Sequence, residues 1–353
     1  MRTTADMGGV PSQASSAVDW TARLAPYQQP DLRRSIVQLS TTAGAFVLLW
    51  AAMLRSLDHG YWLTALLAVP AALCLVRLFL IQHDCSHRAF FRSAKANDRL
   101  GFVLGLVTMT PHQHWRRTHA IHHATAGNLD RRGLGAIDTL TVREYAQLTR
   151  AKKLAYRLYR NPLVLFGIGA TIQFVVMQRF CSAELRSSRR ERASVHATNA
   201  GIAAILAILA ALGGVDRLLL VQAPIIALAS SIGVWLFYVQ HQFEETYWDD
   251  AQRWDYIDAG LRGSSHYALP RFLERLTCRI GLHHIHHLNA RIPNYRLREC
   301  LDADPVLQQA TRITLVQSLK CASLKLWDEE EQRLVGYRRA RRRARRAPSA
   351  ISS

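Results

Sequence analysis

Four long apolar runs alternate with polar, mainly basic segments along the 353 residues of this chain. The runs cover residues 41–54, 61–81, 200–212 and 218–239, and Arg77 is the one charged residue among them. A helix needs about 20 apolar residues to cross a hydrocarbon core, and the first and third runs reach that length with their polar flanks. We therefore predict an all-α integral membrane protein with four transmembrane helices in two hairpins. A buried helix bundle of a soluble protein is the alternative.

Two weaker apolar stretches bear on the number of crossings. Residues 100–111 are too few to cross, whereas residues 161–180 are nearly long enough. Basic residues stand on both sides of the second stretch, so both of its ends should be cytoplasmic. We expect it to be re-entrant or interfacial, with a fifth span as the alternative. On this topology a helical cap forms on the cytoplasmic face.

The net charge of +19 raises the question of nucleic acid binding. The arginines gather at residues 186–192 and 337–346, beside apolar segments and without aromatic residues between them. This pattern favours cytoplasmic loops and contact with anionic membrane lipids, and we expect no nucleic acid partner. The six cysteines form no CxxC pair, so neither a disulfide framework nor a thiolate zinc site is indicated.

Three segments are expected from composition. Residues 1–34 are polar, lack the apolar core of a cleavable signal and should form a mobile cytoplasmic arm. Residues 35–310 should form the membrane domain, and residues 311–353 a basic tail that is helical or disordered. We expect an integral membrane location.

Histidines supply the candidate chemistry. Residues 283–287 read HHIHH, and His283, His286 and His287 share one face of a helix. The same HxxHH spacing recurs at residues 119–123, and residues 83–87 read HDCSH. A single histidine follows the fourth apolar run. On the predicted topology nine histidines meet at the cytoplasmic boundary: His83, His87, His119, His122, His123, His241, His283, His286 and His287.

Nine imidazoles are too many for one metal ion. A structural zinc takes four ligands and a catalytic zinc about three, so two ions with four or five nitrogen ligands each fit the number better. Imidazole suits iron, copper, nickel and zinc, and we favour two irons. Three acidic residues should accept hydrogen bonds from the ligating imidazoles: Asp84, Asp130 and Glu244. We expect no metal bond from His112, His114, His266 or His284; His114 and His284 should donate hydrogen bonds near the site or meet solvent.

These motifs resemble the membrane fatty acid desaturases, whose signature is three histidine boxes, HxxxH or HxxxxH and then two HxxHH boxes. The resemblance extends through residues 125–133, 239–244 and 289–297, and it covers roughly residues 35–310. It is nearest to the bacterial and plastid-type acyl-lipid desaturases that act at position 12 or omega-6.

The resemblance implies a non-haem di-iron centre, dioxygen as oxidant, a fatty acyl lipid as substrate, and electrons from a ferredoxin or a cytochrome-type donor. It also implies a ninth ligand between the fourth span and the third box, where His241 is the candidate. Some family members place an asparagine, which acts through water, one turn before this histidine. Here that position is Phe237, so the last coordination position of one iron stays open.

Two other functions remain as alternatives at this point. A membrane di-iron hydroxylase of alkanes, fatty acids or carotenoids would carry similar boxes. A histidine-rich membrane metal-binding or transport protein is disfavoured, because a transport path needs polar groups within the spans. No haem-binding domain is expected after residue 310, so the electron donor should be external.

Overall fold

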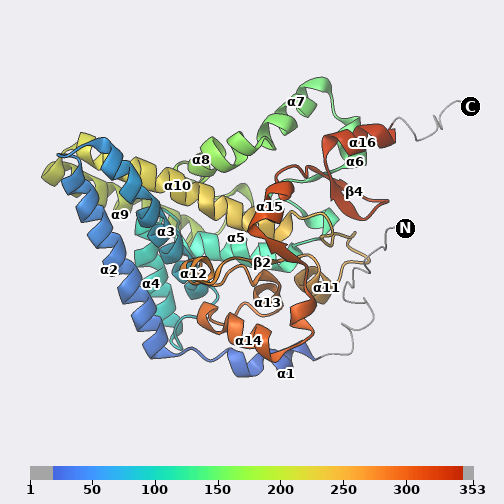
Figure 1. The fold of residues 1–353 in the computed structure, drawn as a ribbon, viewed down its shortest axis with the longest axis horizontal. Helices are drawn as coiled ribbons and strands as arrows, with labels where there is room; N and C mark the ends of the chain where they lie inside the picture. The colour runs from blue at the N-terminus through green and yellow to red at the C-terminus, as the bar shows by residue number, and fades with distance from the viewer. Residues whose placement is uncertain (1–18, 345–353) are drawn as a thin grey trace, which may run out of the picture.

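This computed structural model describes residues 19–344. Residues 1–18 of the predicted mobile arm lie outside the described residues, as do residues 345–353 of the predicted tail. Residues 19–34 are described, and Trp20 and Leu24 among them are buried. Four long helices dominate the fold (Figure 1): α2 Leu32–Ser56, α3 Tyr61–Ser86, α9 Arg189–Gly213 and α10 Val215–His241.

The long helices pair into two hairpins, α2 with α3 and α9 with α10. Each has 25 to 27 residues, or about 40 Å of helix, which exceeds the ~30 Å of a hydrocarbon core. Gly60 and Gly214 stand at the two hairpin turns with φ of 129° and 86°. Glycine adopts these positive angles without a steric penalty, so the turns can be short.

The hairpins pack against each other through α3 and α10. Small and branched residues of α3, such as Ala68 and Ala72, share one buried cluster with Val221 and Ile225 of α10. The outward faces carry exposed apolar side chains such as Leu48 and Leu66, as expected where a helix meets lipid. The hairpin ends far from the histidines are also joined, because Arg217 of α10 pairs with Asp58 at 2.8 Å.

A fifth stretch, Val164–Leu185, is also long and apolar enough to cross a membrane by length and composition. Unlike the other four it is not one regular helix. It consists of a π-helical turn Val164–Ile168, α8 Gly169–Val175 and the 3-10 turns Met177–Arg179 and Ala183–Leu185. The number of crossings depends on this segment, and four crossings stays a prediction.

Shorter elements build the cap beside the histidine-bearing ends. α4 Ala94–Val107 and α5 His112–Thr125 follow the first hairpin. The other short helices are α1 Trp20–Leu24, α6 Val142–Gln147, α7 Arg150–Tyr159, α11 Tyr256–Leu261, α12 Arg271–Leu276, α13 His283–Leu288, α14 Leu297–Ala303, α15 Leu315–Cys321 and α16 Tyr337–Ala344.

Two small sheets correct the all-α prediction to a mainly helical fold. Strands β1 Leu140–Thr141, β4 Leu326–Asp328 and β5 Arg333–Val335 form one sheet in the order β1-β4-β5. Strands β2 His266–Ala268 and β3 Arg312–Thr314 form the other. Each strand has only two or three residues, too few to produce a readable alternation in the sequence.

Residues 312–335 are packed more closely than the tail that we predicted. Ile313 and Cys321 belong to the main buried cluster beside α10, and Trp327 is fully buried against Trp248. These apolar positions could not be recognised in the sequence, because they are scattered among polar and charged residues and form no long apolar run. The packed structure of the cap thus continues past residue 310.

Candidate metal centre

Four elements bring the nine predicted histidines together. The C-terminal end of α3 carries His83, with His87 as its C-cap, and the last turn of α10 carries His241. α5 carries one HxxHH motif and α13 the other. The side chains are buried apart from partial exposure of His87. Long spans that run past the apolar core without a break thus deliver ligands to a site that the short cap helices complete.

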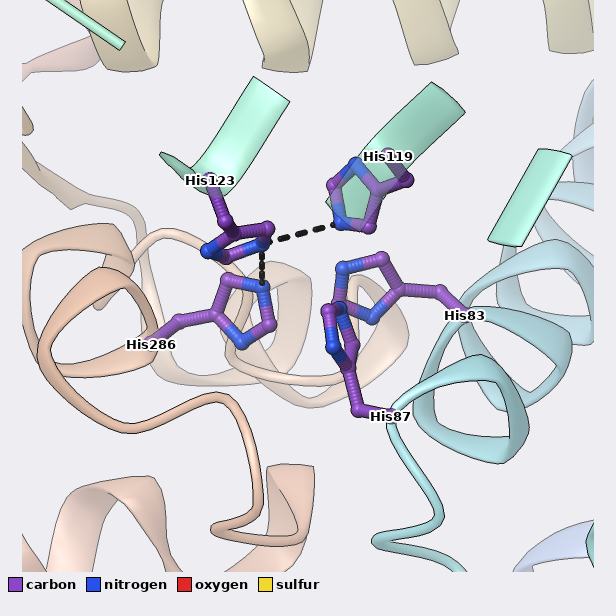
Figure 2. A group of neighbouring side chains, drawn as sticks. All are labelled: His83, His87, His119, His123 and His286. Atoms are coloured by element: carbon purple, nitrogen blue, oxygen red, sulfur yellow. Dashed lines mark hydrogen bonds between the residues drawn. The ribbon is translucent and has the colours of Figure 1, made fainter. Parts of the chain in front are cut away.

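The nine imidazoles divide into two groups in which the ligand atoms lie within 4.8 Å of one another. The first, the five-histidine group, comprises His83, His87, His119, His123 and His286. Figure 2 shows these rings converging from three sides: α3, α5 and α13. The Nε2 atom of His123 lies 3.1 Å from that of His119 and 3.0 Å from that of His286.

The second, the four-histidine group, comprises His122, His241, His283 and His287. His241 Nε2 lies 3.2 Å from His122 Nε2 and 3.0 Å from His283 Nε2. His241, which belongs to no motif, therefore joins two residues that do. The alternation of adjacent histidines explains the division, since His122 and His123 point to different groups, as do His286 and His287.

The donor set fits two metal cations. Burial lowers the pKa of the imidazoles on α5 and α13 well below the usual value, so these rings are neutral at pH 7. A neutral ring has one N–H, so Nε2 of His123 cannot form hydrogen bonds with Nε2 of both His119 and His286. Nε2 of His87 and of His287 lacks any hydrogen-bond partner. Two nitrogens that each lie about 2.1 Å from one ion, at a right angle to each other, are about 3 Å apart. Several of the Nε2 atoms in the two groups are separated by about this distance.

The five-histidine group is held by a carboxylate, as predicted for Asp84. Asp84 Oδ1 lies 3.4 Å from Nδ1 of His83, while Oδ2 accepts hydrogen bonds from the backbone and side-chain amides of Asn294 at 2.9 and 2.8 Å. Gln38 of α2 in turn donates to Asn294 at 2.9 Å. Such partners orient a ligating ring and fix its tautomer. The indole of Trp115 stacks on His119 with ring centroids 4.4 Å apart.

The four-histidine group is supported differently. Nδ1 of His241 lies 3.1 Å from the carbonyl oxygen of Gly263, and donation there leaves Nε2 free to bind an ion. A Cβ at Gly263 would meet the carbonyl oxygen of Ala259 at 2.5 Å, so the loop approaches too closely for any other residue. The ring of Phe237 lies 5.1 Å from that of His122 and 5.4 Å from that of His241.

Arg160 is a component of the site that sequence reasoning missed. Its side chain is fully buried although the residue follows an exposed basic helix. The guanidinium donates at 2.8–3.1 Å to five neutral oxygens: the carbonyls of Asp138 and Leu324 and the side chains of Thr139, Tyr238 and Gln242. Tyr238 and Gln242 flank His241 on the end of α10, so Arg160 fixes the turn that presents this histidine.

The structure places the other two predicted acidic residues away from the imidazoles. Asp130 accepts a hydrogen bond from the backbone of Ala251. Glu244 pairs with Arg333 and Arg339 at 3.5 and 3.6 Å. Asp130 follows the second motif and Glu244 follows His241 closely in sequence, but the chain turns away from the imidazoles before it reaches either carboxylate. These carboxylates stabilise the cap, and the prediction that they contact ligating rings is corrected.

The four histidines that we did not expect to bind metal lie outside both groups of the described residues. His114 Nε2 accepts a hydrogen bond from the backbone of Ser182 at 3.1 Å. His112 lies beside Asp98, at 3.8 Å. His284 is fully buried beside His266, with ring centroids 6.1 Å apart, so it does not meet solvent, which was one of the two expectations for it.

Two cavities approach the groups from different sides. An apolar pocket lies between α3, α8 and α10 and is lined by Phe79, Phe174 and Gly233, among others. Phe79 packs on Trp115, the residue stacked on His119. A second, more polar pocket borders His122, Phe237 and His241 and reaches Arg131 at the surface of the cap. The lining of the apolar pocket suits a hydrocarbon chain, whereas a chain in the polar pocket would bury the charges of Arg131 and Arg132.

Known proteins match this combination of spans and histidines. A fatty acid desaturase family model matches residues 60–312. A fatty acid desaturase of Bacillus subtilis is 43% identical over 318 residues, which is 90% of each chain. An sn-1 oleoyl-lipid 12-desaturase of a Synechocystis species is 26% identical over 233 residues, 64% of this chain and 63% of its own. A Synechocystis sn-1 acyl-lipid omega-3 desaturase (ferredoxin) is 26% identical over 67% of this chain and 66% of its own. The resemblance seen in the histidine motifs is confirmed, and the chain belongs to the fatty acid desaturase family.

Proposed function

We propose that this protein is an acyl desaturase that introduces a cis double bond into a fatty acyl chain with two irons, dioxygen and two electrons. The carrying observation is the sorting of nine buried or partly buried histidines into two groups, each suited to one ion. The overall change converts –CH2–CH2–, O2, two electrons and two protons into –CH=CH– and two molecules of water. Two bound irons would supply dioxygen activation, which side chains alone do not provide.

The apolar pocket between α3, α8 and α10 is our proposed site for the acyl chain. It lies among the apolar long helices, and its wall contacts the five-histidine group through Phe79 and Trp115. Adjacent methylenes are chemically alike, so only position selects the bond to be oxidised. The pocket therefore has to set the bond position by the length of chain that it accommodates.

The protein's own residues hold the site in a reactive form. Asp84 and the Gly263 carbonyl orient one ligand in each group. Burial excludes bulk water and keeps the imidazoles neutral, so their lone pairs remain available. The electrons would come from an external donor of the ferredoxin or cytochrome type. In support, one related enzyme carries ferredoxin in its description.

We also propose that the site lies on the cytoplasmic face of a bacterial inner membrane and that four helices cross. α3 ends at the site, and α9 begins on the same side because its hairpin partner α10 also ends there. The intervening chain thus starts and finishes on one side, so Val164–Leu185 crosses either not at all or twice. Its broken helical structure favours no crossing.

Cysteine accessibility tests this topology. Labels at Ser187→Cys and Gly214→Cys should report opposite sides of the membrane, with Ser187 cytoplasmic. Labelling of both from the same side would contradict the arrangement of the two hairpins.

The activity test is expression of the full chain in a host without polyunsaturated fatty acids, followed by mass-spectrometric location of new double bonds. We expect one new bond at a fixed position, and none with His286→Ala. A hydroxylated product would instead support the hydroxylase alternative. An unchanged lipid profile, from protein shown to hold iron and to be supplied with a reducing donor, would contradict desaturase activity.

A further inference from the structure

Two short helices of the cap leave the same edge of the sheet formed by β2 and β3. The strands are parallel, with His266 opposite Arg312 and Ala268 opposite Thr314. α15 follows β3 directly, and α12 begins shortly after β2. Because parallel strands end at the same edge, both helices start from that edge. Figure 1 shows them beside the long helices rather than at the far end of the cap.

α12 is fixed at a defined depth along α3. The guanidinium of Arg77 in α3 donates to the backbone carbonyl of Arg275 in α12 and, at 2.9 Å, to Thr42 of α2. Arg77 precedes His83 by six residues, or about 9 Å of helix on the membrane side of the histidines. Arg77 thus joins α3 to the cap.

α15 reaches the same depth along α10. Its Ser318 shares a hydrogen bond of 3.2 Å with the hydroxyl of Tyr267, which also lies 3.4 Å from Nε1 of Trp235. Trp235 precedes His241 by six residues, the separation found for Arg77 and His83. The two cap helices therefore extend about 9 Å below the metal-binding ends of the spans, where a bilayer has its headgroup layer.

The outward faces of both helices combine apolar and basic residues. Val316, Leu319 and Phe272 are 77%, 66% and 64% exposed. The cations exposed around them are Arg271, Arg275, Arg312 and Lys320. The one acidic residue of these two helices, Glu274, is buried and paired with Arg298 and Arg279. Each helix thus presents apolar side chains for insertion and positive charge for anionic headgroups.

We propose that α12 and α15 form a single lipid-contacting face that inserts into the headgroup layer of an anionic bilayer and fixes the cap on the membrane. Charge selects this occupant over a second copy of the chain. In a two-fold dimer the same patch faces itself, so these four cations would meet like charges. The proposal goes beyond the reaction and does not depend on it.

Photocrosslinking of the full-length protein in lipid nanodiscs tests the contact. p-Benzoylphenylalanine replaces Val316 or Phe272 in discs of phosphatidylcholine and phosphatidylglycerol. The matched control is Glu330, an exposed residue on the β4–β5 turn, which Figure 1 shows far from the long helices. We expect lipid adducts at both test positions about tenfold above the control. Adducts no more frequent than at Glu330, or crosslinks to a second copy instead, would overturn the proposal.

A second measurement tests the charge. In the Arg271→Gln/Arg275→Gln protein, labelled at Val316, the preference of adducts for phosphatidylglycerol over phosphatidylcholine should fall on the order of tenfold. Retention of bound iron shows that each variant is folded. An unchanged lipid preference would reject the anionic headgroup as the ligand of these arginines.

Discussion

The two histidine groups draw on the same two motifs but are held in place by different means. The five-histidine group rests on side chains: Asp84 and Asn294 hold His83, and Trp115 covers His119. The four-histidine group rests on the end of one span, where a backbone carbonyl and the buried Arg160 position His241. It also borders Phe237 and a pocket open to the cap surface. The same spacing of histidines in sequence therefore does not imply that the two groups are equally rigid or equally accessible.

Loss of a ligand should have the largest effect, and it should be equally severe in both groups. We expect His286→Ala and His241→Ala each to lower turnover at least about 100-fold and to reduce bound iron from about two per chain to about one. Iron analysis and iron spectroscopy of the purified proteins would show that the two variants lose different ions.

The informative contrast is with His266→Ala, which lies in neither group and should keep both irons. A His241→Ala protein with two irons and near-normal turnover would mean that the ninth ligand comes from elsewhere.

Filling the apolar pocket should separate catalysis from metal binding. A Cβ on Gly233 meets nothing within 4 Å, so Gly233→Leu fits the fold while it occupies the pocket. We expect turnover to fall about tenfold or more, or the new double bond to move, with iron content unchanged. Gly44→Leu is the matched control, because Gly44 also has open space but lies on α2 away from the pocket. Equal activity of the two variants would reject the pocket as the acyl site.

Weakening the supports should distinguish the two groups most sharply. Arg160→Gln should lower iron occupancy and perturb the spectrum of the ion in the four-histidine group alone, with turnover reduced about tenfold. Asp84→Asn should lower the occupancy and perturb the spectrum of the ion in the five-histidine group. Arg160→Lys keeps the positive charge but loses the planar set of guanidinium N–H donors. It should therefore restore the spectrum of the ion in the four-histidine group only in part. Equal perturbation of both ions by Arg160→Gln would indicate general destabilisation rather than positioning.

The smallest effect is expected at Phe237. An amide in its place could reach toward His122 and His241, whose rings it now contacts. Phe237→Asn should alter the spectrum of the four-histidine ion while turnover changes only about two- to threefold. A spectrum identical to that of the unchanged protein would show that this side chain does not border the coordination sphere.

The histidine motifs could be recognised in the sequence because their signal is local. Spacings of three and four residues define a helix face, so the motifs at residues 119–123 and 283–287 are visible without any knowledge of the fold. The four long apolar runs are also easy to recognise in the sequence, and all four form long helices. His241 was found through its place at the end of such a run.

The supports other than Asp84 were hidden because they are distant from the histidines in sequence. Asp84 meets Asn294 across 210 positions, and Arg160 meets Gln242 across 82. No sequence periodicity predicts such pairs. A single arginine after a basic helix, such as Arg160, is interpreted from sequence as a solvent-exposed charge. Asp130 and Glu244 were misassigned for the converse reason, since closeness to a motif in sequence did not place them near it in space.

Anyone who grafts the nine histidines onto another helical scaffold would still lack the group that aims His241, because that group is the main-chain oxygen of Gly263. Grafting the histidine side chains alone does not supply this oxygen. The loop that leaves α10 and returns at Gly263 must be transferred whole, and its length becomes a design parameter alongside the ligands themselves. Insertions and deletions in this loop, more than substitutions, would then decide whether a transplanted centre binds its second ion.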